Sequence, residues 1–158
     1  MQVAPAALTF SRGNEHIAGL RLTPKGLFRF FARCCNTPLG NALGPGFPFV
    51  GISVRSFDTR DKSTDQTFGA PRGTIHGRNA IGGAPAGSTK IDLPLIARAL
   101  FLILSWRLSG KQWPHPFFDR ATGGSSRPMT ILSFAERAEL RHRKPRATSL
   151  NSGAVARS

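Results

Sequence analysis

Glycine and proline residues occur along almost the whole chain, and they limit the length of the helices and strands that it can form. The 158 residues include 17 Gly and 12 Pro, which favour turns and interrupt helices and strands. Most elements should therefore be short strands, and residues 93–108 form the one long apolar stretch. We predict a mainly β fold of the α+β class, with an apolar helix and a second, short helix in the C-terminal part.

Segments rich in apolar and aromatic residues predict where the strands lie. Residues 3–10, 16–22 and 27–33 are separated by turn sequences, and this arrangement is typical of an antiparallel meander. A further strand is expected over residues 47–55, and a short one near residues 74–78. The chain has 12 Phe and no Tyr, so most of its aromatic side chains should be buried in the core.

The changes in composition along the chain predict four regions. Residues 1–78 form a partial β domain, and residues 79–91, rich in Gly, Ala and Ser, form a linker or long loop. Residues 92–142 form a helical and loop extension that packs on the sheet. The composition of residues 143–158 predicts a disordered basic tail.

Residues 93–108 predict a helix that is apolar on nearly every side. Asp92 is a plausible N-cap and Gly110 is placed to end the helix, while Arg98 and Ser105 form the only polar stripe. Sixteen residues rise about 24 Å, which is less than the roughly 30 Å of a bilayer core, so a transmembrane span is excluded. We expect the helix to be buried against the sheet; insertion into a membrane interface is the alternative.

Two features are expected around and after this helix. The Pro-rich segment over residues 113–119 should form a loop whose bulky side chains cover the core. Ser133 and Glu136 have the spacing of a capping box, which predicts a short helix ending near His142.

The formal net charge of +14 is the most unusual global property. Such a charge attracts nucleic acid and anionic lipid, but the excess is spread along the chain. The one local cluster consists of Arg137, Arg141, Arg143, Lys144 and Arg146. We expect non-specific polyanion binding at most, and keep as the alternative function a basic binding module that contacts nucleic acid or an anionic membrane surface.

The vicinal pair Cys34-Cys35 is the strongest candidate for chemistry. Thiolates are natural ligands of tetrahedral zinc, but a structural site requires four ligands. The four histidines, His16, His76, His115 and His142, are scattered, so the alternatives of inert thiols and of a redox pair stay open. Two cysteines give no disulfide framework, and with no visible secretory signal this predicts a cytoplasmic protein.

Four segments are distinctive in their order and spacing. They are Leu8-Thr9-Phe10 with Arg12-Gly13, residues 20–27 (LRLTPKGL), residues 34–41 (CCNTPLGN), and residues 116–119 (PFFD) followed by Ala121-Thr122-Gly123. Through them, over about residues 3–135, the chain resembles an uncharacterised bacterial family related to the glutathione-dependent formaldehyde-activating and centromere-protein-V-like proteins.

This resemblance implies a β-tent fold of coiled antiparallel sheets that hold zinc between cysteine motifs. In the relatives, a Cys-x-x-Cys-Gly-Thr motif supplies two ligands of a structural zinc. Here Cys35-Asn36-Thr37 matches the end of that motif, Ala32 stands where its first cysteine is expected, and Cys34 is the candidate replacement. Cys34 and Cys35 would thus form half of a structural zinc site.

The earlier cysteine motifs of the relatives, which supply the catalytic zinc ligands, have no counterpart in this sequence. The resemblance therefore implies a truncated zinc-binding domain that lacks the catalytic metal ligands, whereas full-length relatives act like carbon–sulfur lyases on glutathione adducts. We assign no catalytic residue. A sheet edge left unpaired by the shortened domain would favour a homo-oligomer.

Overall fold

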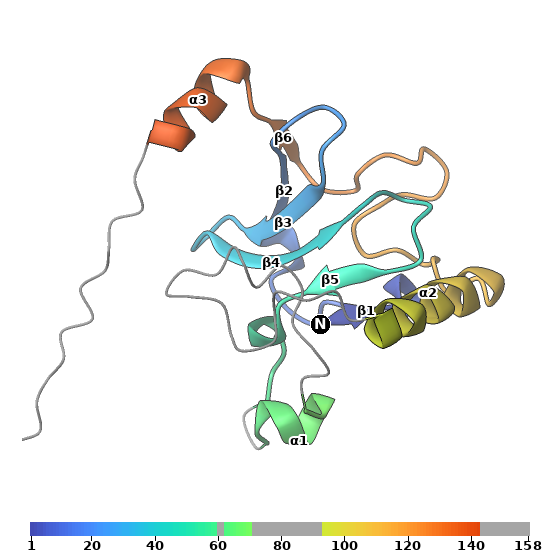
Figure 1. Ribbon diagram of the computed structural model, residues 1–158. Helices are drawn as coiled ribbons and strands as arrows, with labels where there is room; N and C mark the ends of the chain where they lie inside the picture. The colour runs from blue at the N-terminus through green and yellow to red at the C-terminus, as the bar shows by residue number, and fades with distance from the viewer. Residues whose placement is uncertain (60–61, 71–92, 143–158) are drawn as a thin grey trace, which may run out of the picture.

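The computed structural model describes residues 1–59, 62–70 and 93–142, and these form an α+β fold built on one open, six-stranded mixed sheet (Figure 1). The strand order is β1-β5-β4-β3-β2-β6. The strands are β1 (Gln2–Val3), β2 (Ile17–Arg21), β3 (Phe28–Ala32), β4 (Thr37–Ala42), β5 (Val50–Ile52) and β6 (Met129–Ile131). The helices are α1 (Thr64–Phe68), α2 (Leu93–Leu108) and α3 (Phe134–His142), with short 3-10 turns at Pro5–Ala7, Asn14–His16 and Val54–Ser56.

The predicted strands over residues 16–22 and 27–33 are confirmed as β2 and β3, which pair antiparallel from Ile17↔Ala32 to Leu20↔Arg29. The predicted strand over residues 3–10 is wrong. It is replaced by the two-residue β1 and a 3-10 turn, because Pro5 has a fixed φ and no N–H to give to a neighbouring strand. β1 pairs with β5 and not with β2, so the meander does not begin at the N-terminus.

Strand β4 was not predicted, because its sequence TPLGNA contains Pro, Gly and Asn, which are poor strand formers. It nevertheless pairs with β3 on one side and β5 on the other. Pro38 is accommodated because β5 pairs only with Gly40 to Ala42, and because the β3–β4 register shifts between Phe30 and Phe31. Gly40 is required there, since a Cβ would lie 2.4 Å from the carbonyl oxygen of Gly51.

The core lies between the sheet and the segment that follows α2. Phe30 of β3 and Phe117 are 1% and 0% exposed, and their rings stack at a centroid distance of 3.8 Å. Phe118 meets Phe28 edge-on at 4.8 Å, and Leu8 joins the same buried cluster. The prediction that residues 113–119 cover the core is therefore confirmed.

The chain returns from this cover to the sheet as β6, which pairs parallel with β2 from Gly19↔Met129 to Arg21↔Ile131. The side chain of Arg127 fixes the position of the segment that leads into β6. Its guanidinium donates to the carbonyl oxygen of Pro116 at 2.9 Å and to Oδ1 of Asn14 at 2.7 Å. The edges of the sheet are thus β1, with two residues, and β6, with three.

The helix predicted over residues 93–108 is confirmed with the same bounds as α2, and Gly110 follows it with a positive φ of 66°. The prediction that it is buried against the sheet is wrong, because no residue of α2 is buried. The core face of the sheet is already covered by Phe117, Phe118 and Leu8. No helix among the described residues has the length and apolar character needed to cross a membrane.

The capping box predicted at the start of the last helix is confirmed. Ser133 Oγ accepts from the N–H of Glu136 at 3.2 Å, and the Glu136 carboxylate accepts from the N–H of Ser133 at 2.7 Å. The same reciprocal pattern, between Ser63 and Gln66, starts α1, which was not predicted. The strand expected near residues 74–78, the linker over 79–91, the Asp92 N-cap and the tail over 143–158 lie outside the described residues.

Candidate functional site

The two cysteines lie in the tight turn that joins β3 to β4, and we call residues 33–36 the cysteine turn. The N–H of Cys35 donates to the carbonyl oxygen of Ala32 at 3.4 Å, which closes the turn. Asn36 leaves it with a φ of 54°, the only positive φ of a non-glycine residue in the described part of the chain. Asn is among the few residues that tolerate this left-handed conformation. The turn holds both thiols exposed to solvent.

The two thiols of the cysteine turn have different environments. Cys34 Sγ donates to Cys35 Sγ at 3.6 Å, and Cys35 Sγ lies 3.0 Å from Oγ1 of Thr37. The hydrogen bond to Cys35 is the main reason that the pKa of Cys34 is raised. The side-chain hydroxyl of Thr37, followed by its backbone N–H, lowers the pKa of Cys35. Cys35 is therefore the sulfur that ionises first.

The cysteine turn lies next to the 3-10 turn Asn14–His16, which sequence analysis did not connect with it. The backbone N–H of Arg33 donates to the carbonyl oxygen of His16 at 2.8 Å. The guanidinium of Arg33 donates to the backbone carbonyl oxygen of Glu15 at 3.3 Å. The Glu15 carboxylate and the His16 imidazole contact each other at 3.3 Å. The β2–β3 register creates this proximity, and only a correct register prediction could have revealed it.

The described residues do not bring together a complete metal site. No group of three or more His, Cys, Asp and Glu side chains meets among them. Ala32 lies at the end of β3, paired with Thr37, in the position where the resemblance placed a cysteine. Of the other histidines, His115 is in the core and His142 ends α3, while His76 is outside the described residues.

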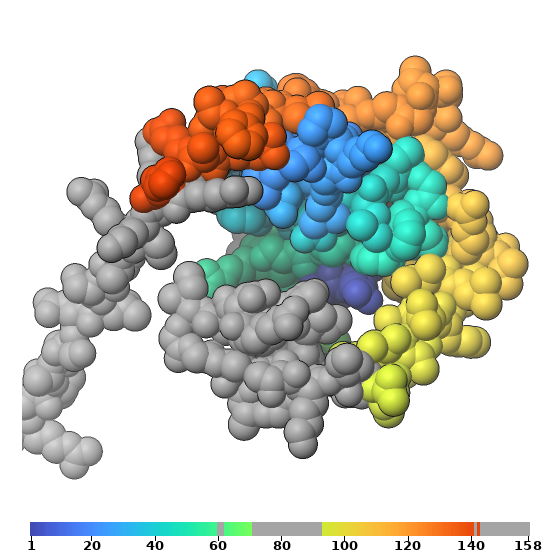
Figure 2. Space-filling view, turned by 45° about the horizontal axis from the view of Figure 1, so that its top comes forward, coloured from blue at the N-terminus to red at the C-terminus, as the bar shows by residue number. Residues whose placement is uncertain are grey.

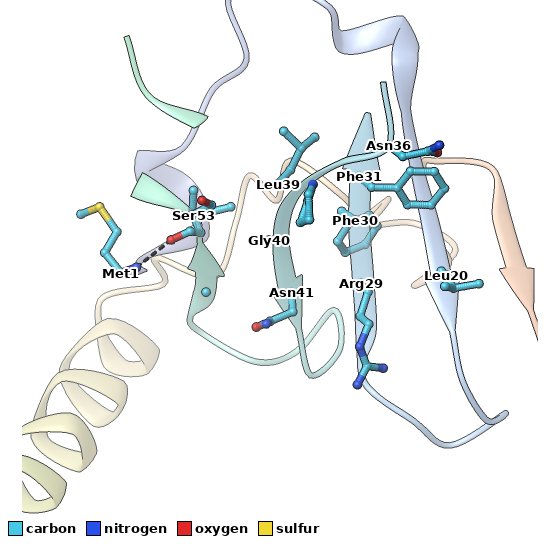
Figure 3. Close-up of a pocket in the computed structure, with 13 residues that line it drawn as sticks. Met1, Leu20, Arg29, Phe30, Phe31, Asn36, Leu39, Gly40, Asn41 and Ser53 are labelled. Carbon is cyan, nitrogen blue, oxygen red and sulfur yellow. Dashed lines mark hydrogen bonds between the residues drawn. The ribbon is translucent and has the colours of Figure 1, made fainter. Parts of the chain in front are cut away.

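An open pocket of about 670 Å³ is lined by residues of β2, β3, β4 and β5 and reaches the cysteine turn at Asn36 (Figure 3). Arg29 and Asn41 are paired across β3 and β4, and both line the pocket (Figure 3). Leu20, Phe31 and Leu39 supply apolar lining. Arg29 is the only lining residue with a charged side chain, so the pocket suits an apolar molecule that carries an anionic group.

His115, one of the scattered histidines, lies in aromatic surroundings. The imidazole is 8% exposed and lies among Trp113, Phe117 and Phe118. Its Nδ1 accepts from the N–H of Phe117 at 3.2 Å, while Nε2 has no partner. Burial lowers the pKa of His115 to about 4. This histidine is a neutral part of the core.

The basic cluster predicted near the C-terminus is described only in part. Arg137 in α3 stacks over the ring of Phe134, with its guanidinium carbon 5.6 Å from the ring centroid, and donates to the carbonyl oxygen of Ser133 at 3.2 Å. The Arg141 side chain and the basic residues after His142 lie outside the described part of the chain. Polyanion binding through this cluster stays a prediction.

Comparison with known proteins relates the chain to a protein family. A protein-family model with the description "Family of unknown function (DUF6151)" matches residues 1–128, which include the cysteine turn, the pocket and α2. Neither the curated proteins nor the solved structures contain a match.

Proposed function

The chain belongs to the DUF6151 family of unknown function, and we propose that it is a relative of the glutathione-dependent formaldehyde-activating proteins in which Cys34 and Cys35 provide half of a zinc–thiolate site. The proposal concerns metal binding and assigns no catalytic residue. One observation carries it, the geometry of the two sulfur atoms in the cysteine turn.

The distance between the two sulfur atoms suits a shared tetrahedral metal ion. With Zn–S bonds of about 2.3 Å and tetrahedral angles, two thiolate ligands are about 3.8 Å apart. Cys34 Sγ and Cys35 Sγ are 3.6 Å apart and both are exposed. Cys35 also has a lowered pKa, which favours the thiolate that a metal requires. The residues therefore fit two of the four ligand positions.

The backbone of the cysteine turn supports the proposed relationship. Asn36 stands where the related motif has Gly, and its φ of 54° is a conformation that Gly and Asn both adopt. The following Thr37 matches the related motif and contacts Cys35. We further propose that the open sheet corresponds to one sheet of a β-tent, with the β3–β4 hairpin carrying the metal-binding turn.

The remaining ligand positions determine how tightly the metal is held. Because the described residues contain no third ligand grouped with the two thiols, an isolated chain should bind zinc weakly, with water in the open positions. Two copies that each contribute one cysteine turn would complete a four-sulfur site around one zinc ion.

Cobalt substitution tests the proposal directly, because a Co²⁺ ion bound by thiolates gives a charge-transfer band that reports sulfur ligands. We expect the purified, reduced chain to show this band on titration with Co²⁺, and Zn²⁺ to displace it. Cys35→Ser should remove most of the band, and Cys34→Ser should weaken it. Thr37→Val is the matched control: both thiols stay, so the band should persist but require a higher pH.

Two results would contradict the proposal. One is the absence of a thiolate band even at a pH where Cys35 is ionised. The other is a band of unchanged intensity in the double Cys34→Ser/Cys35→Ser variant, which would place the metal elsewhere. Light scattering in the presence of zinc distinguishes one copy per metal from two.

A further inference from the structure

Helix α2 exposes an apolar surface that the described residues of the chain leave uncovered. Large apolar side chains along its length are exposed to solvent: Leu93 71%, Ile96 44%, Leu100 60%, Phe101 70%, Leu104 58% and Leu108 79%. At about 100° per residue these six positions fall within roughly 140° of one another around the axis. They therefore lie on one side of the helix, which Arg107 shares near the C-terminal end, and we call these six apolar side chains the apolar stripe of α2.

The opposite side of α2 is the one that faces the rest of the molecule. Its half-buried residues are Leu95, Ala99, Leu102, Ile103, Ser105 and Trp106, which lie about half a turn away from the apolar stripe. The C-terminal end is fixed by two hydrogen bonds: the guanidinium of Arg107 donates to the carbonyl oxygen of Gly46 at 2.7 Å, and the carbonyl oxygen of Lys111 accepts from the N–H of Ala6 at 3.0 Å. Figure 2 shows α2, in yellow, at the rim of the molecule.

The charged side chains within α2 and in the segment that follows it are all cationic. Arg98, Arg107 and Lys111 are exposed, and the chain contains no Asp or Glu from residue 93 to residue 118. This local excess lies in a chain with a formal net charge of +14. A second copy facing the stripe would bring these cations close to one another, whereas an anionic surface would attract them.

We propose that α2 is an interfacial helix that binds the surface of an anionic lipid bilayer. The apolar stripe enters the boundary between headgroups and acyl chains, and the side chains of Arg98 and Lys111 extend to the lipid phosphates. The helix lies in the plane of the surface, because its 16 residues rise only about 24 Å against a hydrocarbon core of roughly 30 Å. This function is independent of the proposed metal site.

Vesicle co-sedimentation of the full chain tests this proposal. We expect binding to phosphatidylcholine vesicles that contain roughly a third phosphatidylglycerol, and much weaker binding to phosphatidylcholine alone or at high salt. Phe101→Ser/Leu104→Ser should weaken binding by about tenfold or more. Phe134→Ser/Leu140→Ser is the matched control, since it removes one Phe and one Leu that are 76% and 51% exposed on α3, and it should bind like the wild type.

A second measurement keeps the apolar surface intact and locates the contact. Phe101→Trp should add a tryptophan signal that shifts to shorter wavelength with anionic vesicles and is quenched by brominated lipid, whereas Phe134→Trp should add a signal that does neither. Far-UV circular dichroism should show the same helix content in every variant, because all four positions are exposed.

Three outcomes would overturn the proposal. The first is an unchanged affinity of Phe101→Ser/Leu104→Ser for anionic vesicles. The second is equal binding to neutral and anionic vesicles. The third is a wild-type dimer in light scattering that becomes a monomer in the same variant without any binding to vesicles, which would assign the apolar stripe to a second copy of the chain.

Discussion

Lowering the pH from about 7 to about 5 should destabilise the protein through a single buried side chain, His115. The imidazole is 8% exposed and packs among aromatic rings. Its Nδ1 already accepts a hydrogen bond from the N–H of Phe117, and Nε2 has no partner. Protonation would remove that acceptor and place a charge among aromatic rings, so the folded state keeps His115 neutral.

The magnitude follows from the pKa of His115, which burial lowers from 6.5 to about 4. Between these two values the unfolded chain binds more protons than the folded one, so the free energy of unfolding falls as the pH falls. Above pH 6.5 His115 is mostly neutral in both the folded and the unfolded chain, so it makes the free energy of unfolding little dependent on pH there. By about pH 5 the loss should reach about 2 kcal/mol, and below pH 4 about 3 kcal/mol.

Urea unfolding at about pH 7, 6 and 5 measures this loss, with circular dichroism as the probe. His115→Asn is the control variant, because its side-chain oxygen can still accept from the Phe117 N–H but does not titrate. It should be less stable than the wild type at neutral pH and nearly independent of pH over this range. The pKa values of Asp119 and Glu136 are lowered from 3.8 and 4.5, so these carboxylates lose their contributions only at lower pH.

Equal falls in stability for the wild type and His115→Asn would refute this reasoning, since the pH dependence would then come from another group. A His115 pKa near 6.5, measured by NMR titration of the folded protein, would refute it independently.

Other predictions concern the sheet, the core and the thiols. Gly40→Ala should destabilise the protein by about 2 kcal/mol or more in urea unfolding, because the new Cβ would meet the Gly51 carbonyl oxygen at 2.4 Å. Gly44→Ala is the control: a Cβ there has nothing within 4 Å, so stability should change by less than about 1 kcal/mol. Phe117→Ala should cost about 3–5 kcal/mol in the same assay, since the side chain is 0% exposed, and a cost below about 1 kcal/mol would contradict its place in the core. In alkylation followed by peptide mass analysis, Cys35 should react faster than Cys34 near neutral pH, because its pKa is lowered while that of Cys34 is raised; the reverse order would contradict the assigned hydrogen bonds.

For the candidate site, the sequence located the cysteine turn but not its surroundings. The sequence identified Cys34 and Cys35 as the candidate ligands, whereas their exposure in the turn between β3 and β4 became known only from the structure. Glu15 and His16 lie close to the cysteine turn only because β2 and β3 are placed side by side. The pocket beside Arg29 likewise depends on the pairing of the strands. The shift in the pKa of His115 likewise depends on burial among rings that are contributed by tertiary packing.

For the fold, the sequence by itself determined the elements whose signals are local. The apolar residues and the turn signals beside them placed β2, the aromatic residues placed β3, the apolar run predicted both ends of α2, and the Ser133–Glu136 capping box predicted the start of α3. These features arise from backbone propensity and from contacts within a few residues.

Only the tertiary structure decided the pairing of β1 with β5, the formation of β4 from a weak strand sequence, and the parallel return of β6 beside β2. It also decided which apolar segment covers the core. Phe117 and Phe118 occupy the face of the sheet that α2 was expected to cover, and a core face accommodates one close-packed layer. The most apolar segment of the chain therefore keeps one side exposed, because burial depends on the space that the other segments leave and hydrophobicity alone does not specify it.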